Sequence, residues 1–164
     1  MESIICSINL KLIMMKYLRI KSIIISATII WIIAVAAFVA SYFVPIMSDP
    51  DLQANWVISI VLIPSATLGA HIYYRNGYKT NGLALGGFIF LVAMILDALI
   101  TVPVFIIPNG GNYISFFTDP GFWLIGAEIV IVVAAYWKIE KTVKAIRVAK
   151  TLIRSKSASL KADF

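Results

Sequence analysis

The chain has little of what soluble enzymes use for chemistry. Its 164 residues include one cysteine, Cys6, and one histidine, His71. A single cysteine excludes an intramolecular disulfide and a redox pair, and a single histidine excludes a multi-histidine metal site. The sequence also has no Gly-x-x-x-x-Gly-Lys phosphate loop and no nucleophile-elbow motif. We therefore expect no enzyme, no bound metal and no cofactor.

Charge is scarce as well. Only 13% of the residues are charged, whereas 61% are hydrophobic. A soluble domain of this size could not hide that much apolar surface, so lipid must be the solvent for much of the chain. The apolar runs predict one compact membrane domain at 23–137, with four spans at about 23–45, 56–74, 83–108 and 122–137.

The first span has a competing interpretation. It follows a basic segment, as the apolar core of a secretory signal peptide does. Such cores run about 7–15 residues, and this run is longer, which favours a retained anchor. Residues 1–13 precede Met14 and Met15 and could be an upstream extension.

Basic and acidic residues fall on opposite sides of the predicted spans. Lys and Arg precede span one, fill the loop at 75–82 and follow span four, whereas the other two loops carry Asp49, Asp51 and Asp119. Positive charge marks the cytoplasmic side. The expected fold is all-α: an integral membrane four-helix bundle with both termini in the cytoplasm. A basic N-terminus at 1–22 and a basic amphipathic C-terminal extension at 138–164 would flank it.

Two carboxylates lie inside the predicted spans, Asp97 in the third and Glu128 in the fourth. A charge there costs on the order of 3 kcal/mol by insertion scales, so it normally faces protein or water. At about 1.5 Å per residue, both acids fall at nearly the same level, so they could meet, with Thr101 one turn beyond Asp97. They would then share a proton or an alkali cation, or form a structural hydrogen bond with one acid neutral. The sequence leaves both interpretations open.

His71 and the tail are the other candidate sites. His71, near the inner end of span two, could relay protons, although a hydrogen bond to backbone or a headgroup is the commoner role. The tail carries the whole net charge of +6, and it could continue span four or lie along the membrane surface; residues 155–164 are expected to be disordered. Its charge predicts either a topology signal or a site for anionic lipid headgroups rather than nucleic acid. The residues concerned are Lys141, Lys144, Arg147, Lys150 and Arg154.

A narrow stripe that includes several small residues runs along the third span. Gly82, Gly86, Phe90, Ala93, Asp97 and Thr101 recur at spacings of three and four, and Gly82-x-x-x-Gly86 matches the GxxxG pattern. Packing within the chain is the simpler interpretation, and an interface between two copies is the alternative.

The start Met15-Lys16, the four spans and the string LDALITVP at 96–103 resemble bacterial families of small, uncharacterised four-helix membrane proteins. The likeness covers about residues 15–137 and implies a bacterial inner-membrane location, but neither an activity nor functional residues. The small multidrug-resistance exporters are similar in size and also use a membrane carboxylate. Theirs lies in the first span, where this chain has none, which argues against membership.

Two functions are compatible with these features. The first is a non-catalytic accessory, assembly or stress-related subunit, in which the two acids hold the fold; the lack of a transport motif favours it. The alternative is an oligomeric transporter for small solutes, coupled to cations or protons through Asp97 and Glu128. The expected partners are the lipid bilayer with its anionic headgroups and either a second copy or a larger membrane complex.

Overall fold

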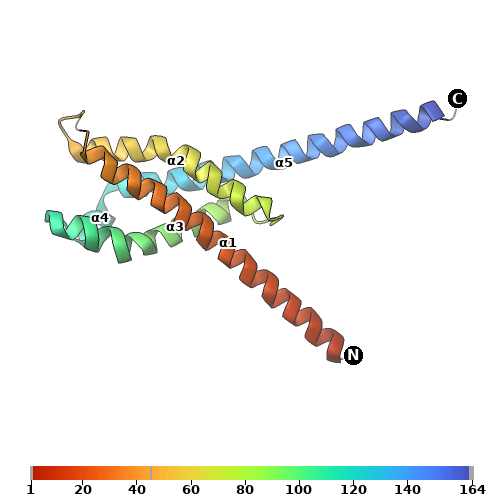
Figure 1. Ribbon diagram of the computed structural model, residues 1–164, viewed down its shortest axis with the longest axis horizontal. Helices are drawn as coiled ribbons and strands as arrows, with labels where there is room; N and C mark the ends of the chain where they lie inside the picture. The colour runs from red at the N-terminus through yellow and green to blue at the C-terminus, as the bar shows by residue number, and fades with distance from the viewer. Residues whose placement is uncertain (1, 45, 163–164) are drawn as a thin grey trace.

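The computed structural model is built from helices alone within the described parts of the chain (Figure 1). It describes the backbone of residues 2–44 and 46–162, and the side chains of residues 10, 13–44 and 46–154. The helices, in chain order, are α1 (Glu2–Tyr42), α2 (Pro50–Arg75), α3 (Gly82–Leu96), the π-helix η1 (Asp97–Ile106), the 3₁₀-helix η2 (Ile107–Asn109), α4 (Tyr113–Thr118) and α5 (Pro120–Ala162).

Four helical stretches are long and apolar enough to cross a membrane: Ile13–Tyr42, Pro50–Arg75, Gly82–Asn109 and Pro120–Arg154. They overlap the four predicted spans and, for the most part, extend beyond them. Only 17–33% of the residues in their apolar windows are buried within the chain, and many large apolar side chains are exposed. Such a surface is unfavourable in water and acceptable in lipid. The expectation of an all-α fold with four apolar helices is confirmed.

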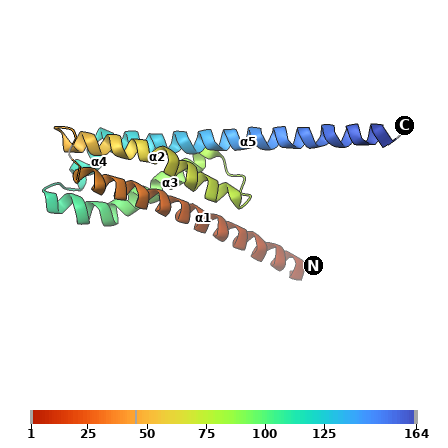
Figure 2. The same cartoon turned by 45° about the horizontal axis from the view of Figure 1, so that its top comes forward.

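Successive long helices run in opposite directions, so the connections gather at two ends (Figure 2). Helix α1 packs against α2 and α3, and α5 packs against the same two helices. We call the end with residues 46–49 and 110–119 the acidic end, because it carries Asp49 and Asp119. The end with residues 76–81, which carries Lys79, is the basic end.

The hydrophobic core lies in the half of the molecule nearer the basic end. Ala66 and Ala70 on α2 are fully buried there, as are Leu85 and Ile89 on α3. A Cβ atom added to Gly69 would lie 2.5 Å from Cδ1 and 2.8 Å from Cγ1 of Ile30, so a larger residue there would require the Ile30 side chain to move. Small residues thus let the helices pack tightly in this half.

The GxxxG stripe packs against α5. A Cβ atom on Gly82 would lie 2.8 Å from Cα of Ala134, and one on Gly86 would lie 2.7 Å from Cα of Val130. Both glycines therefore bring the α3 and α5 backbones together. The motif serves packing within the chain.

One side chain holds the connection between α1 and α2. Gln53 is 5% exposed, and its amide makes four hydrogen bonds. Nε2 donates to the carbonyl oxygens of Ser41 and Val44 at 2.7 and 2.8 Å, and Oε1 accepts from the amides of Ile46 and Met47 at 2.7 and 2.8 Å. Backbone groups that no helix satisfies are thereby paired.

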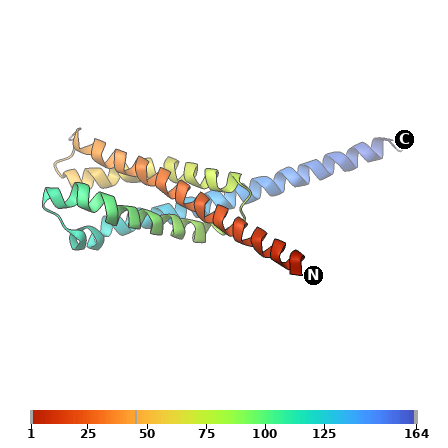
Figure 3. The ribbon, with the colours of Figure 1, turned by 60° about the horizontal axis from the view of Figure 1, so that its bottom comes forward.

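The first turns of α1 and the last turns of α5 extend past the other helices and diverge (Figure 3). Helix α5 continues from the span into the tail without a break as far as Ala162. Residues 155–162 are therefore helical, where we expected disorder. The side chain of Cys6 lies outside the described residues.

Candidate binding cavity

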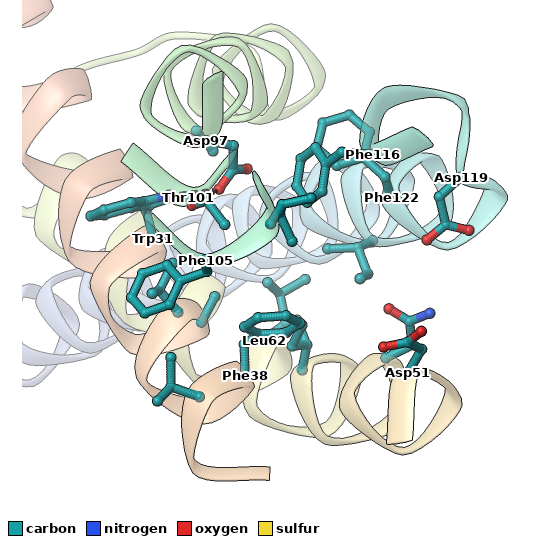
Figure 4. A pocket seen from close by; sticks show the side chains of 18 of the residues that line it. Trp31, Phe38, Asp51, Leu62, Asp97, Thr101, Phe105, Phe116, Asp119 and Phe122 are labelled. Carbon is teal, nitrogen blue, oxygen red and sulfur yellow. Dashed lines mark hydrogen bonds between the residues drawn. The ribbon is translucent and has the colours of Figure 1, made fainter. Parts of the chain in front are cut away.

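A cavity of about 900 Å³ lies between the helices in the half nearer the acidic end (Figure 4). Residues of α1, α2, α3, η1, α4 and α5 all contribute to its wall. The exposed side chains of Asp49, Asp51 and Asp119 line its outer part, so it opens at the acidic end. Trp31 lines its deep part and precedes Tyr42 by three turns, about 16 Å of helix. The cavity therefore reaches the middle of the spans, and its volume is within the usual range for small-molecule sites, roughly 300–1,000 Å³.

Asp97 lies in the deep part of the cavity, half-buried. Its Oδ1 atom accepts one hydrogen bond from Nε1 of Trp31 at 2.8 Å and another from Oγ1 of Thr101 at 2.6 Å. Its Oδ2 atom has no hydrogen-bond partner among the described residues. One oxygen is therefore held in place, and the other is available to a ligand.

Asp97 is also the first residue of a π-helix. In this pattern the amide of residue i bonds to the carbonyl of residue i−5, and the amide of Ile107 bonds in this way to Val102. Pro103 has no N–H for the carbonyl of Ala98. The hydroxyl of Tyr113 donates to that carbonyl instead, at 3.2 Å. The tyrosine thus substitutes for the missing proline donor, and π-helical turns are frequent at functional sites.

Four carboxylates line the cavity, and no Lys, Arg or His of the described chain does. Asp49 and Asp119 also cap α2 and α5, and Asp51 accepts a hydrogen bond from the Tyr42 hydroxyl at 2.7 Å. None of the four acids forms an ion pair within the described part of the chain. The cavity is therefore uniformly acidic.

Aromatic rings make up much of the wall. Short helix α4 places Phe116 against Phe122 of α5, with ring centroids 5.2 Å apart, and Phe122 lies 5.6 Å from Phe90 of α3. Facing them are rings from α1 and η1. The aromatic lining residues are Trp31, Phe38, Tyr42, Phe43, Phe90, Phe105, Phe116 and Phe122.

The structure does not bring Asp97 and Glu128 together. No hydrogen bond joins them within the described chain, and Glu128 does not line the cavity, although its neighbours Ile125 and Ile129 do. Glu128 is half-buried and has no hydrogen-bond or ion-pair partner among the described residues. The contact that the sequence allowed between the two carboxyls is therefore absent from the described part of the chain.

The register between α3 and α5 explains this difference. Gly86 packs against Val130, and Phe90 packs against Gly126, so Glu128 is level with residues 86–90 of α3. The aspartate lies at least seven residues further along, about 10 Å at 1.5 Å per residue. Counting from the span ends assumed that the end of span three lies level with the start of span four, and the packing of α3 against α5 has a different register.

The remaining predicted residues lie away from the cavity. Nδ1 of His71 and the hydroxyl of Tyr136 on α5 are 2.9 Å apart, near the basic end, and neither residue lines the cavity. The basic residues predicted as a lipid site are all exposed on the α5 extension. Among them, Lys144 pairs with Glu140 at 2.6 Å and Lys141 lies over the Trp137 ring.

Trp31 lines the cavity beside Asp97, and the sequence analysis missed it. Its position in the sequence is unusual. Tryptophan in membrane spans favours the interfaces, whereas Trp31 lies in the middle of an apolar run. An indole N–H at that depth needs an acceptor, and acids inside the spans are few. The sequence alone could therefore have predicted a hydrogen bond between Trp31 and one of the two acids inside the spans.

The fold defines the class of this molecule: a multi-pass, membrane-embedded all-α protein. The chain belongs to a family of unknown function (DUF5367), whose model matches residues 45–139. This confirms the resemblance to uncharacterised families. The matched segment includes Asp97 and Thr101 but not Trp31. No curated protein and no solved structure matches the chain.

Proposed function

We propose that this protein binds a small cationic solute in the Asp97 cavity and carries it across the membrane in exchange for protons. The observation that carries the proposal is the Oδ2 atom of Asp97, free of any partner in the described chain, in a cavity that the described residues line with four carboxylates and no basic side chain. A carboxylate at this depth is stable when it holds a proton or faces a cation. Binding of one therefore displaces the other, which is the basis of exchange.

The charge distribution supports a direction for this exchange. The loop at the basic end and the α5 extension carry the Lys and Arg residues that mark the cytoplasmic side of a bacterial inner membrane. In that orientation the four-helix bundle has both termini in the cytoplasm, and the cavity opens to the outside. The tightly packed core closes it on the cytoplasmic side.

Flux measurements on the full chain in proteoliposomes test the proposal. The vesicles contain a pH-sensitive dye, and gradients of Na⁺, K⁺, ammonium, tetramethylammonium and benzyltrimethylammonium are applied in turn. We expect at least one cation to drive proton movement with the wild type and none to do so with Asp97→Asn. Glu128→Gln is the matched control, because Glu128 lies outside the cavity, and should behave as the wild type. A panel in which no cation drives flux that depends on Asp97 would show that the proposal is wrong.

A non-catalytic accessory role is the second candidate, and the α5 extension supports it. Ile139, Ile146 and Ile153 are exposed there among basic residues. Surfaces of this kind bind anionic lipid or an acidic partner. Removing residues 143–164 separates the two roles. An accessory subunit would lose a larger complex on gentle purification, whereas cation-driven flux depends on the cavity alone.

A further inference from the structure

The shape and lining of the cavity indicate what kind of cation it takes. We infer that the ligand is an amphipathic organic cation with one positive charge, an ammonium or similar group attached to an aromatic or bulky apolar body. This inference rests on the proposed function, because it names the ligand of the same site.

A bare metal or alkali ion does not fit the available donors. Ca²⁺, for example, takes about 6–8 oxygen ligands. In the deep part of the cavity the side-chain oxygens come from Asp97 and Thr101, and the Thr101 hydroxyl already donates to Asp97. The described chain also contains no group of three or more His, Cys, Asp or Glu residues that could hold a metal. A small ion in a cavity of about 900 Å³ would remain surrounded by water and apolar side chains.

The walls beside Asp97 suit an organic cation. The rings of Phe38, Phe105 and Phe116 project from three different elements toward the same space as the carboxyl (Figure 4). A cation within about 6 Å of a ring centroid is attracted by the ring face, and more strongly where water is excluded. Trp31 is fixed beside the carboxyl by its own hydrogen bond. Carboxylate and rings therefore act on the same charged group.

The rest of the lining fits the apolar body of such a ligand. Leu62, Ile125 and Ile129 line the cavity from α2 and α5. A strongly hydrated ion would keep water against these side chains, whereas an apolar body removes water from them. The volume accommodates a molecule well above the size of a simple ammonium ion.

The carboxylates that line the cavity determine the sign and the number of charges on the ligand. The outer part of the cavity carries Asp49, Asp51 and Asp119. A cleft lined by one sign of charge concentrates ions of the opposite sign. Anions are repelled at the same point. Only one carboxylate, Asp97, lies in the deep part, which matches a single positive charge on the bound ligand.

Calorimetric titration of the purified full chain in detergent micelles tests this inference, with empty micelles as the blank. The probes are benzyltrimethylammonium, tetramethylammonium, which has the charge without the ring, and benzylsulfonate, which has the ring with the opposite charge. We expect benzyltrimethylammonium to bind at least tenfold more tightly than tetramethylammonium and benzylsulfonate to show no binding. Asp97→Asn should weaken the first probe at least tenfold.

An aromatic variant tests the ring contribution. Phe105→Leu keeps an apolar side chain in the cavity wall and removes one ring face, so benzyltrimethylammonium should bind about threefold or more weakly. Phe88→Leu is the matched control, because Phe88 is 52% exposed on α3 and does not line the cavity. It should bind as the wild type does. Equal affinities for Phe105→Leu and the wild type would contradict the role of the rings.

The outcomes separate this inference from the proposed function. If benzyltrimethylammonium does not bind but Na⁺, K⁺ or ammonium drives proton flux that depends on Asp97, the inference is wrong and the transport proposal stands. If tetramethylammonium binds as tightly as benzyltrimethylammonium, the apolar body of the ligand adds nothing to binding, and the inference is again wrong while the transport proposal is unaffected. If benzyltrimethylammonium binds equally to wild type and Asp97→Asn, the cavity is not its site, and the inference is also wrong. If neither proton flux nor binding differs between the wild type and Asp97→Asn, both the inference and the transport proposal are wrong.

Discussion

Replacing Asp97 by asparagine should remove cation binding and leave the fold intact. The hydrogen bonds from Trp31 and Thr101 both go to Oδ1. Asparagine has a carbonyl oxygen that can take that place, and its amino group then stands where the free Oδ2 faces the cavity. The two donors keep their acceptor, and only the negative charge is lost.

The magnitude follows from a comparison with leucine. Asp97→Leu leaves the Trp31 indole N–H and the Thr101 hydroxyl without their acceptor, and a typical hydrogen bond contributes about 1 kcal/mol net. Because both variants remove the acid, losing both bonds should leave Asp97→Leu roughly 2 kcal/mol less stable than Asp97→Asn, or about 4–8 °C lower in Tm for a chain of this size. Asp97→Asn should cost less than about 1 kcal/mol, because both bonds persist.

Thermal unfolding in detergent at one fixed pH, followed by circular dichroism, measures these shifts, and calorimetry on the same preparations measures cation binding. Glu128→Gln is the control: it removes an acid without a partner in the described chain, so Tm should be unchanged or higher. If Asp97→Asn unfolds at the same temperature as Asp97→Leu, the second oxygen has a structural role. The assignment of Oδ2 to a ligand would then be refuted.

Two further predictions concern the packing. Gln53→Leu removes four hydrogen bonds at the turn after α1 and should lower the stability by about 3 kcal/mol; Thr67→Ala, an exposed site on the same helix, should change it little, and equal melting temperatures for both would contradict the role of the amide. Gly86→Ala places a Cβ 2.7 Å from the Val130 backbone and should destabilise by about 2 kcal/mol in chemical or thermal unfolding. Gly87→Ala, which meets nothing within 4 Å, should be neutral or slightly stabilising, and the same loss at both glycines would exclude a packing effect.

The central residue of the site could be found from the sequence because its signal is local. A carboxylate inside a long apolar run is costly wherever the helix packs, so Asp97 stood out without any knowledge of its neighbours. Thr101 was found in the same way, since a residue four positions on lies on the same helix face. The first position follows from local composition and the second from helical periodicity.

Contacts between helices were beyond the same reasoning. The register between α3 and α5 depends on where Gly82 and Gly86 contact the α5 backbone. That register separates Glu128 from Asp97 by about 10 Å along the helices. The π-helix depends in a similar way on Tyr113, a residue from a separate helix that satisfies one carbonyl.

The sequence by itself determined the number of apolar helices, the charge at each end and the residue that carries the deep carboxylate, because composition and helical periodicity are local properties. Only the tertiary structure decided that Trp31 would hold Asp97, that Glu128 would stay apart, and that tight packing near one end would leave a cavity near the other. Those outcomes depend on which helix faces meet and at what level. Glycines fix both where the α3 and α5 backbones touch.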